Sequence, residues 1–243
     1  MAVPNNDLGP GHGALVRVGG VAVILGLAIH IVLNSVLKEF PPENPTATEL
    51  QEYLTREAGT WAVVHGFRYL AFACVVLFAT GLFSRVSQAG AAAGGGWGVV
   101  GLLGTAMWVT NGVITNGIET VAFLNLDLVS QRQELFWLLF RLTRVLFTAE
   151  IAAWSITILG FSVAGWRSGT IPKWLAMLGL LAAVLGMLSS IFIVPILNEG
   201  RASILMGLAA PMSMLWLLCT GVYMALRGAT GVPASQRSGP ENG

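Results

Sequence analysis

Charged and polar side chains stand within or beside long apolar stretches of this chain, and their types suggest specific chemistry. An arginine binds anionic groups, a glutamate holds a cation or carries a proton, and a histidine accepts a proton or ligates a metal. Because an ionised side chain in hydrocarbon costs about 2.5 kcal/mol or more, such residues are expected to face a shared polar interior. The candidate ligand-binding residues are His30, Asn34, His65, Arg68, Asn111, Glu119, Arg141, Arg144 and Glu150.

The spacing of these residues places them on common helix faces. His30 and Asn34 are four positions apart and His65 and Arg68 are three apart, so each pair lies on one side of a helix. Arg68 needs a counter-ion inside a membrane, and Glu119 in the following apolar stretch is the expected partner.

Two arginines are expected at the boundary of the fourth apolar stretch. Counting about 20 residues back from Trp166 places this boundary near Leu146. Arg141 and Arg144 would then lie at the membrane interface, with Glu150 just inside it. We therefore expect Arg144 to be the counter-ion of Glu150.

Six apolar stretches supply the elements that must position these residues. Each has the length of about 20 residues that a membrane-spanning helix needs. The sequence therefore predicts an all-α fold, a polytopic bundle of six transmembrane helices. The predicted spans are residues 18–37, 61–84, 97–122, 145–166, 174–197 and 203–226.

The spans and their short connections form one predicted transmembrane domain, residues 17–227. Residues 1–16 and 228–243 are predicted to be flexible tails, because neither segment is long enough to fold separately.

The first outer loop is predicted to contain a short amphipathic helix. Thr46 or Thr48 would begin this helix and Gly59 would end it. The helix would lie along the membrane interface or act as a moving lid over the bundle. Its apolar face consists of Leu50, Tyr53 and Leu54, and its water-facing side of Glu49, Glu52 and Arg56.

Composition agrees with a membrane protein and argues against other classes. The chain has 243 residues, of which 55% are hydrophobic and 10% charged, and its formal net charge is +1. An ordinary soluble domain is far more polar, and a nucleic-acid-binding protein would carry basic runs that are missing here. The lipid bilayer is the expected partner.

Basic residues gather on one side of the six predicted spans. Short cytoplasmic loops retain an excess of lysine and arginine, so this side and both termini are expected to be cytoplasmic. Most of the acidic residues fall on the opposite, outer side. The residues of the basic side are Arg17, Arg85, Arg167, Lys173, Arg227 and Arg237.

No motif for a metal, a nucleotide or covalent catalysis is present. Cys74 and Cys219 both fall in apolar spans, and no Cys/His spacing suggests a metal site. We expect no cofactor. A b-type haem ligated by His30 and His65 is an alternative, because neighbouring helices could bring both imidazoles together. Whether the protein is an enzyme is left open.

Residues 155–190 resemble part of a known bacterial family. There the sequence SITILGFSVAGWRSGTIPKWLAMLGLLAAVLGMLSS ends one span in a basic-Ser-Gly turn and opens the next with an aliphatic-Pro-basic-Trp-Leu entry. This stretch is similar to the corresponding junction in a six-helix integral membrane family of unknown function. The resemblance implies the fold and a bacterial cytoplasmic (inner) membrane, and it implies no activity.

The leading hypothesis is a membrane protein with a polar pocket in its outer half that binds a small polar or amphiphilic ligand, and transports or senses it. His65, Arg68, Arg141 and Arg144 would attract an anionic headgroup. One alternative is an intramembrane enzyme or a haem or quinone redox protein that uses His30 and His65. Another is a structural or regulatory membrane subunit whose polar network only orders the helices.

The charge bias predicts the topology. Reporters placed after Ala92 and after Ser168 should read as cytoplasmic, and a reporter near Asn44 should read as external. Alkaline phosphatase and fluorescent protein fusions measure both sides. The opposite labelling pattern would overturn the predicted orientation but not the helix boundaries, which depend on length.

Overall fold

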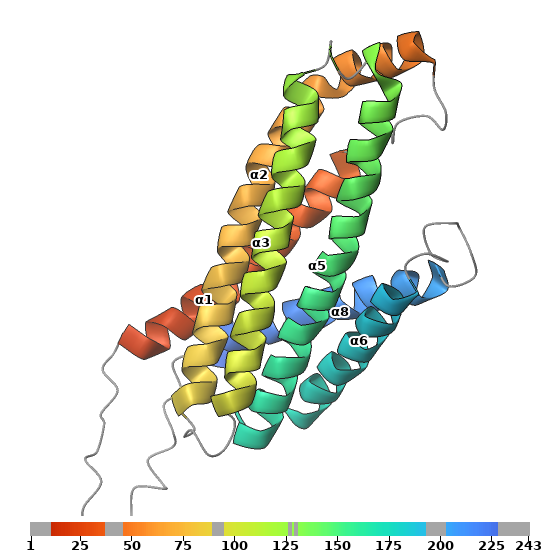
Figure 1. Cartoon of the computed structure of the whole chain (residues 1–243). Helices are drawn as coiled ribbons and strands as arrows, with labels where there is room; N and C mark the ends of the chain where they lie inside the picture. The colour runs from red at the N-terminus through yellow and green to blue at the C-terminus, as the bar shows by residue number, and fades with distance from the viewer. Residues whose placement is uncertain are drawn as a thin grey trace, which may run out of the picture.

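The computed structural model of the chain describes residues 11–36, 46–88, 95–125, 128, 131–192 and 203–227 (Figure 1). Much of the predicted tails and of the first loop lies outside these residues. The regular elements within them are the helices α1 (Gly11–Val36), α2 (Ala47–Gln88), α3 (Gly96–Leu124), α5 (Gln133–Ser168), α6 (Lys173–Ile191) and α8 (Ser203–Arg227). The predicted all-α fold with six long helices is confirmed.

All six helices are long and apolar enough to cross a membrane. Their outward faces are apolar as well, since Val21, Leu103 and Leu181 are each more than half exposed. Apolar surface on this scale is found where lipid covers it. By length and composition, the chain is therefore a polytopic membrane protein.

The helices form a closed ring in which each one contacts the next along the chain, and α8 returns to α1. In Figure 1, α2, α3 and α5 stand side by side, with successive helices running in opposite directions. α1 and α8 cross behind them. A polar side chain on the inner face of one helix can therefore meet partners from two or more others.

Apolar packing is concentrated in two places along the bundle. The main core joins α1, α2, α5, α6 and α8 and includes Val23, Phe78, Phe161, Leu175, Trp216 and Met224. A smaller cluster of Tyr53, Leu54 and Phe136 joins the start of α2 to the start of α5. We call this second region the aromatic end, and the opposite one, where α2 ends and α8 ends, the basic end.

The basic end is tied together by Arg85 of α2. Its Nε donates a hydrogen bond to the carbonyl of Thr170, in the turn between α5 and α6, at 3.1 Å. Its guanidinium also lies 5.0 Å from the ring of Tyr223 on α8. Gly169 turns the chain here with φ of 64°, a conformation that favours glycine. One arginine thus links three parts of the ring.

The prediction of a separate amphipathic helix in the first loop is wrong, because α2 is continuous from Ala47 to Gln88. Thr46 does begin it: Thr46 N donates to Glu49 at 2.8 Å and Glu49 N to the Thr46 hydroxyl at 3.3 Å. The backbone N–H of Thr46, followed by its hydroxyl, holds the pKa of Glu49 below its ordinary value. Gly59 does not stop the helix, since Gly169 is the only described glycine with positive φ and an interior glycine costs only about 1 kcal/mol.

The two faces predicted for this segment are nevertheless present in the first turns of α2. Tyr53 and Leu54 are 3% and 1% exposed, whereas Glu52 and Arg56 face outward. The side chain of Leu50 lies outside the described residues. Figure 1 shows these turns lying across the ends of α3 and α5, so they close the aromatic end.

Helix α5 begins at Gln133 and therefore extends beyond the predicted start of the fourth span near Leu146. Arg141 and Arg144 interrupt the apolar run in sequence. On the helix they are three positions apart and both exposed, so they do not prevent its inner face from packing.

Glycines bring α3 and α5 into close contact. A Cβ on Gly104 would lie 2.5 Å from the backbone nitrogen of Thr157, and one on Gly160 would overlap the backbone of Gly101. Backbones that approach so closely leave no room for any side chain at the crossing. The packing of these two helices therefore depends on glycine at these positions.

We predict that Gly160→Ala lowers the stability of the bundle by about 1 to 3 kcal/mol, because the new methyl group forces α3 away from α5. Thermal unfolding in detergent measures this loss. Gly117→Ala on α3 is the matched control, since a Cβ there meets nothing within 4 Å. Its melting temperature should stay the same or rise with helix propensity. Equal effects in both variants would contradict the close-packing argument.

Candidate functional site

A histidine and an asparagine form the buried centre of the polar region. His65 on α2 is 4% exposed and Asn116 on α3 is 1% exposed. His65 Nδ1 lies 2.5 Å from Asn116 Oδ1, and Asn116 Nδ2 donates to the backbone carbonyl of His65 at 3.1 Å. Because a carbonyl only accepts, the amide nitrogen must face it, and the amide oxygen then faces Nδ1. His65 Nδ1 therefore carries the proton. Its Nε2 is buried without a partner among the described residues.

An arginine–carboxylate pair lies beside this centre. Arg68 on α2 donates to Glu119 on α3 at 2.5 Å, so the predicted counter-ion pair is confirmed. The same carboxylate oxygen is 3.8 Å from His65 Nδ1. The two side chains are 30% and 22% exposed, which makes the pair partly buried.

The two contacts between α2 and α3 cross each other. His65 to Asn116 and Arg68 to Glu119 have the same sequence separation of 51 residues. Because α2 and α3 run in opposite directions (Figure 1), two contacts with the same sequence separation cannot both join residues at the same height in the bundle. From α2 to α3, one contact slants toward one end of the bundle and the other slants toward the opposite end. A slide of one helix along the other would lengthen one contact or the other, whichever its direction. The crossed pairs thus set the register of α2 against α3.

Aromatic rings continue the site toward the aromatic end. Trp61, His65 and Phe123 form a triangle of rings: Trp61 stacks on His65 and on Phe123, with centroids 5.4 and 5.0 Å away, and His65 and Phe123 are 6.0 Å apart. Its indole N–H donates to the hydroxyl of Tyr53 at 3.4 Å. This stack connects the buried histidine to the first turns of α2.

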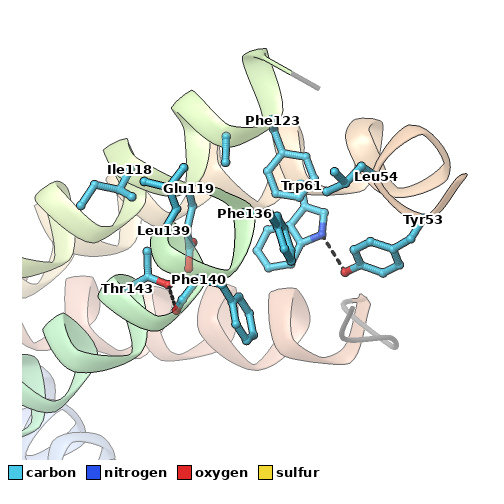
Figure 2. A pocket seen from close by; sticks show the side chains of 11 residues that line it. Tyr53, Leu54, Trp61, Ile118, Glu119, Phe123, Phe136, Leu139, Phe140 and Thr143 are labelled. Carbon is cyan, nitrogen blue, oxygen red and sulfur yellow. Dashed lines mark hydrogen bonds between the residues drawn. The ribbon is translucent and has the colours of Figure 1, made fainter. Parts of the chain in front are cut away.

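A small pocket opens among these rings (Figure 2). Its volume is about 40 Å³, enough for roughly one to three water molecules. Apolar and aromatic side chains from α2, α3 and α5 form its walls, and Glu119 supplies the one carboxylate. The lining residues are Tyr53, Leu54, Trp61, Ile118, Glu119, Ala122, Phe123, Phe136, Leu139, Phe140 and Thr143.

Three of the pocket rings have an arginine guanidinium over them, a favourable cation–π arrangement. The pairs are Arg56 with Tyr53 at 5.9 Å, Arg68 with Trp61 at 5.8 Å and Arg144 with Phe140 at 4.9 Å. Cations thus surround an aromatic pocket.

Glu150 on α5 is buried at 9% exposure but is not paired with Arg144. No ion pair joins these two residues in the part of the chain that the structure describes, so that prediction is wrong. Positions six apart on a helix are about 120° apart around its axis, and Arg144 is exposed on the other side. Glu150 instead faces the Thr115 hydroxyl, within electrostatic range of Arg68 and Glu119.

The remaining predicted residues lie around this cluster or away from it. The His30 side chain on α1 is exposed, and the charge of Arg68 reaches it electrostatically. Arg141 is exposed on α5, and Asn111 is half-buried on α3. The side chain of Asn34 lies outside the described residues.

Sequence reasoning missed Asn116 and the aromatic walls of the pocket. Asn116 precedes Glu119 by three positions, as His65 precedes Arg68, and this matched spacing was the available signal. Phe123, Phe136 and similar residues carry no signal of this kind, because phenylalanines are common throughout membrane helices.

Comparisons with known proteins add no family: the chain matches no protein-family model, no curated protein and no solved structure. Among the residues described, no group of three or more His, Cys, Asp or Glu side chains forms a possible metal site. The haem alternative and the resemblance to a six-helix family stay predictions.

We predict that Arg68→Leu destabilises the protein by roughly 2 kcal/mol, less than the 3–5 kcal/mol typical of fully buried pairs because this one is partly exposed. The loss follows from leaving the Glu119 carboxylate without its cation. Arg141→Leu, on the exposed face of α5, is the matched control and should change the melting temperature little. The double variant Arg68→Leu/Glu119→Leu should recover part of the loss, and a purely additive result would contradict the pairing.

Proposed function

We propose that the protein binds an amphiphilic ligand at the aromatic end, with the apolar part of the ligand in the pocket and an anionic headgroup at Arg144. The observation that carries this proposal is the combination of apolar walls from three helices with arginines over the rings. Binding pockets for small molecules have this makeup, mostly apolar with a few polar groups.

Arg144 is the residue best suited to the headgroup. Arg68 is engaged by Glu119 and Arg56 by Glu57, at 2.5 and 3.0 Å. Arg144 is exposed and has no carboxylate within ion-pair distance in the described ranges. Its guanidinium lies over Phe140, whose ring lines the pocket. An anion bound there would be next to the pocket.

Ligand entry requires the first turns of α2 to move. A volume of about 40 Å³ is far too small for an alkyl chain or an aromatic ring. Tyr53 and Leu54 form one wall of the pocket, and they belong to the segment that lies across the aromatic end. This supports the lid hypothesis over a purely interfacial helix. The motion of this segment would then decide between the two roles, transport of the bound amphiphile and sensing of it.

We also propose an orientation of the protein in the membrane. We place the aromatic end on the outer side and the basic end in the cytoplasm of a bacterial cell, as the arginine and lysine bias predicts. The ligand would then come from the outer leaflet or from outside the cell.

The small size of the pocket supports a second candidate, a structural or regulatory subunit. In that case the crossed pairs of α2 and α3 hold the helices together and no ligand enters. Both candidates share the same network, so a binding measurement must separate them.

We predict saturable binding of dibromostearate, an anionic amphiphile that quenches tryptophan fluorescence, by the wild-type protein in neutral detergent. Ala122→Phe fills the pocket and should weaken this binding at least about tenfold, equivalent to 1.4 kcal/mol. Ala106→Phe, an exposed position on α3, is the matched control and should bind normally. Equal binding by all three proteins would leave the structural candidate as the better one.

A second arm of the experiment tests the headgroup. Arg144→Gln should weaken binding of dibromostearate but leave binding of the uncharged dibromostearyl alcohol unchanged. Arg141→Gln is the control. Equal effects of Arg144→Gln on both probes would contradict a role for its charge.

A further inference from the structure

Glu150 is a carboxyl group inside a membrane-spanning helix without a neutralising cation. It is 9% exposed, and no arginine, lysine or histidine lies within ion-pair distance among the described residues. A bare carboxylate in such a place is costly, so the group needs either a cation or a proton.

The hydrogen bond of Thr115 to Asn111 favours a proton on Glu150. The Thr115 hydroxyl donates its one proton to the backbone carbonyl of Asn111 at 2.9 Å. Only its lone pairs then remain for Glu150, which lies against it. A carboxylate has only lone pairs to offer in return. While the Thr115 proton stays on the Asn111 carbonyl, Glu150 can form a hydrogen bond to this hydroxyl only by donating a proton of its own, and a Glu150 carboxylate would have to draw the hydroxyl proton away from Asn111.

The charged groups around Glu150 agree with a neutral acid. The helices that pack against α5 are α2, α3 and α6. From α2 and α3, Arg68 and Glu119 reach Glu150 electrostatically, and they already neutralise each other. The described part of α6 has only one charged residue, Lys173, at its first position near the basic end.

We propose that Glu150 is a proton-binding site in the interior of the bundle, and that its proton controls the Arg68–Glu119 pair. When the proton is present, Glu150 donates to Thr115 and Arg68 stays with Glu119. When the proton leaves, the Glu150 carboxylate competes with Glu119 for the same guanidinium. One arginine shared by two carboxylates gives two arrangements of the site.

This proton is connected to the pocket because Glu119 is one of the lining residues. Loss of the proton from Glu150 would draw Arg68 away from Glu119, and the carboxylate at the pocket wall would lose its counter-ion. Binding of an anionic amphiphile would then be linked to the proton at Glu150. This link rests on the proposed function, whereas the proton site does not.

Dicyclohexylcarbodiimide tests the proton site without any ligand. The O–H of a protonated, apolar carboxyl group adds across one C=N bond of the reagent, and the adduct rearranges to a stable N-acylurea with no leaving group. Peptide mass mapping of the wild-type protein in detergent should find the label on Glu150, with less label as the pH is raised. Label on Glu119 instead, or none on Glu150, would overturn the proposal.

Glu119→Gln tests the sharing of Arg68. The substitution frees the guanidinium to pair with Glu150, which should lower labelling at Glu150 several-fold. Glu57→Gln is the matched control, because that carboxylate pairs with Arg56 away from the site. Unchanged labelling of Glu150 in Glu119→Gln would contradict the shared arginine.

Dibromostearate separates this proposal from the proposed function. If the probe binds but leaves labelling of Glu150 unchanged, the link between proton and pocket is wrong and ligand binding stands. If Glu150 is labelled and the probe does not bind, the proton site stands and the proposed function fails.

Discussion

The need to neutralise Arg68 within a membrane-spanning helix is the constraint on which the rest of the polar region depends. A guanidinium in hydrocarbon is stable only beside a partner, and Glu119 on α3 is that partner. The pair brings the inner faces of α2 and α3 together. His65 and Asn116 then meet next to it, where Asn116 satisfies one of the two imidazole nitrogens.

The crossed arrangement of the two pairs also determines what lies above and below them. Toward the aromatic end, Trp61 stacks on His65, and both Trp61 and Glu119 line the pocket. Toward the middle of the bundle, Glu150 approaches Thr115 within range of Arg68. A change in the partner of Arg68 would thus alter the electrostatic surroundings of both the pocket and Glu150.

The two ends of the bundle are built on different principles. Near the basic end, the large apolar core and the arginine at position 85 hold five helices together. At the aromatic end, closure depends on a few side chains of α2, such as Tyr53 and Leu54. A segment held by so few contacts opens at lower cost than the core, which is where a ligand entrance is expected.

The number of the spans, the faces of Tyr53 and Leu54, and the pairing of Arg68 with Glu119 could be predicted from sequence, because they follow from apolar run length, helical periodicity and the cost of charge in lipid. Tertiary structure alone decided the continuity of α2 through Gly59, the exposure of Arg144, the partnership of His65 with Asn116 and the aromatic pocket. The reason is physical. Each of these depends on which side chains of other helices lie opposite, and one helix's periodicity does not specify the register of its neighbours.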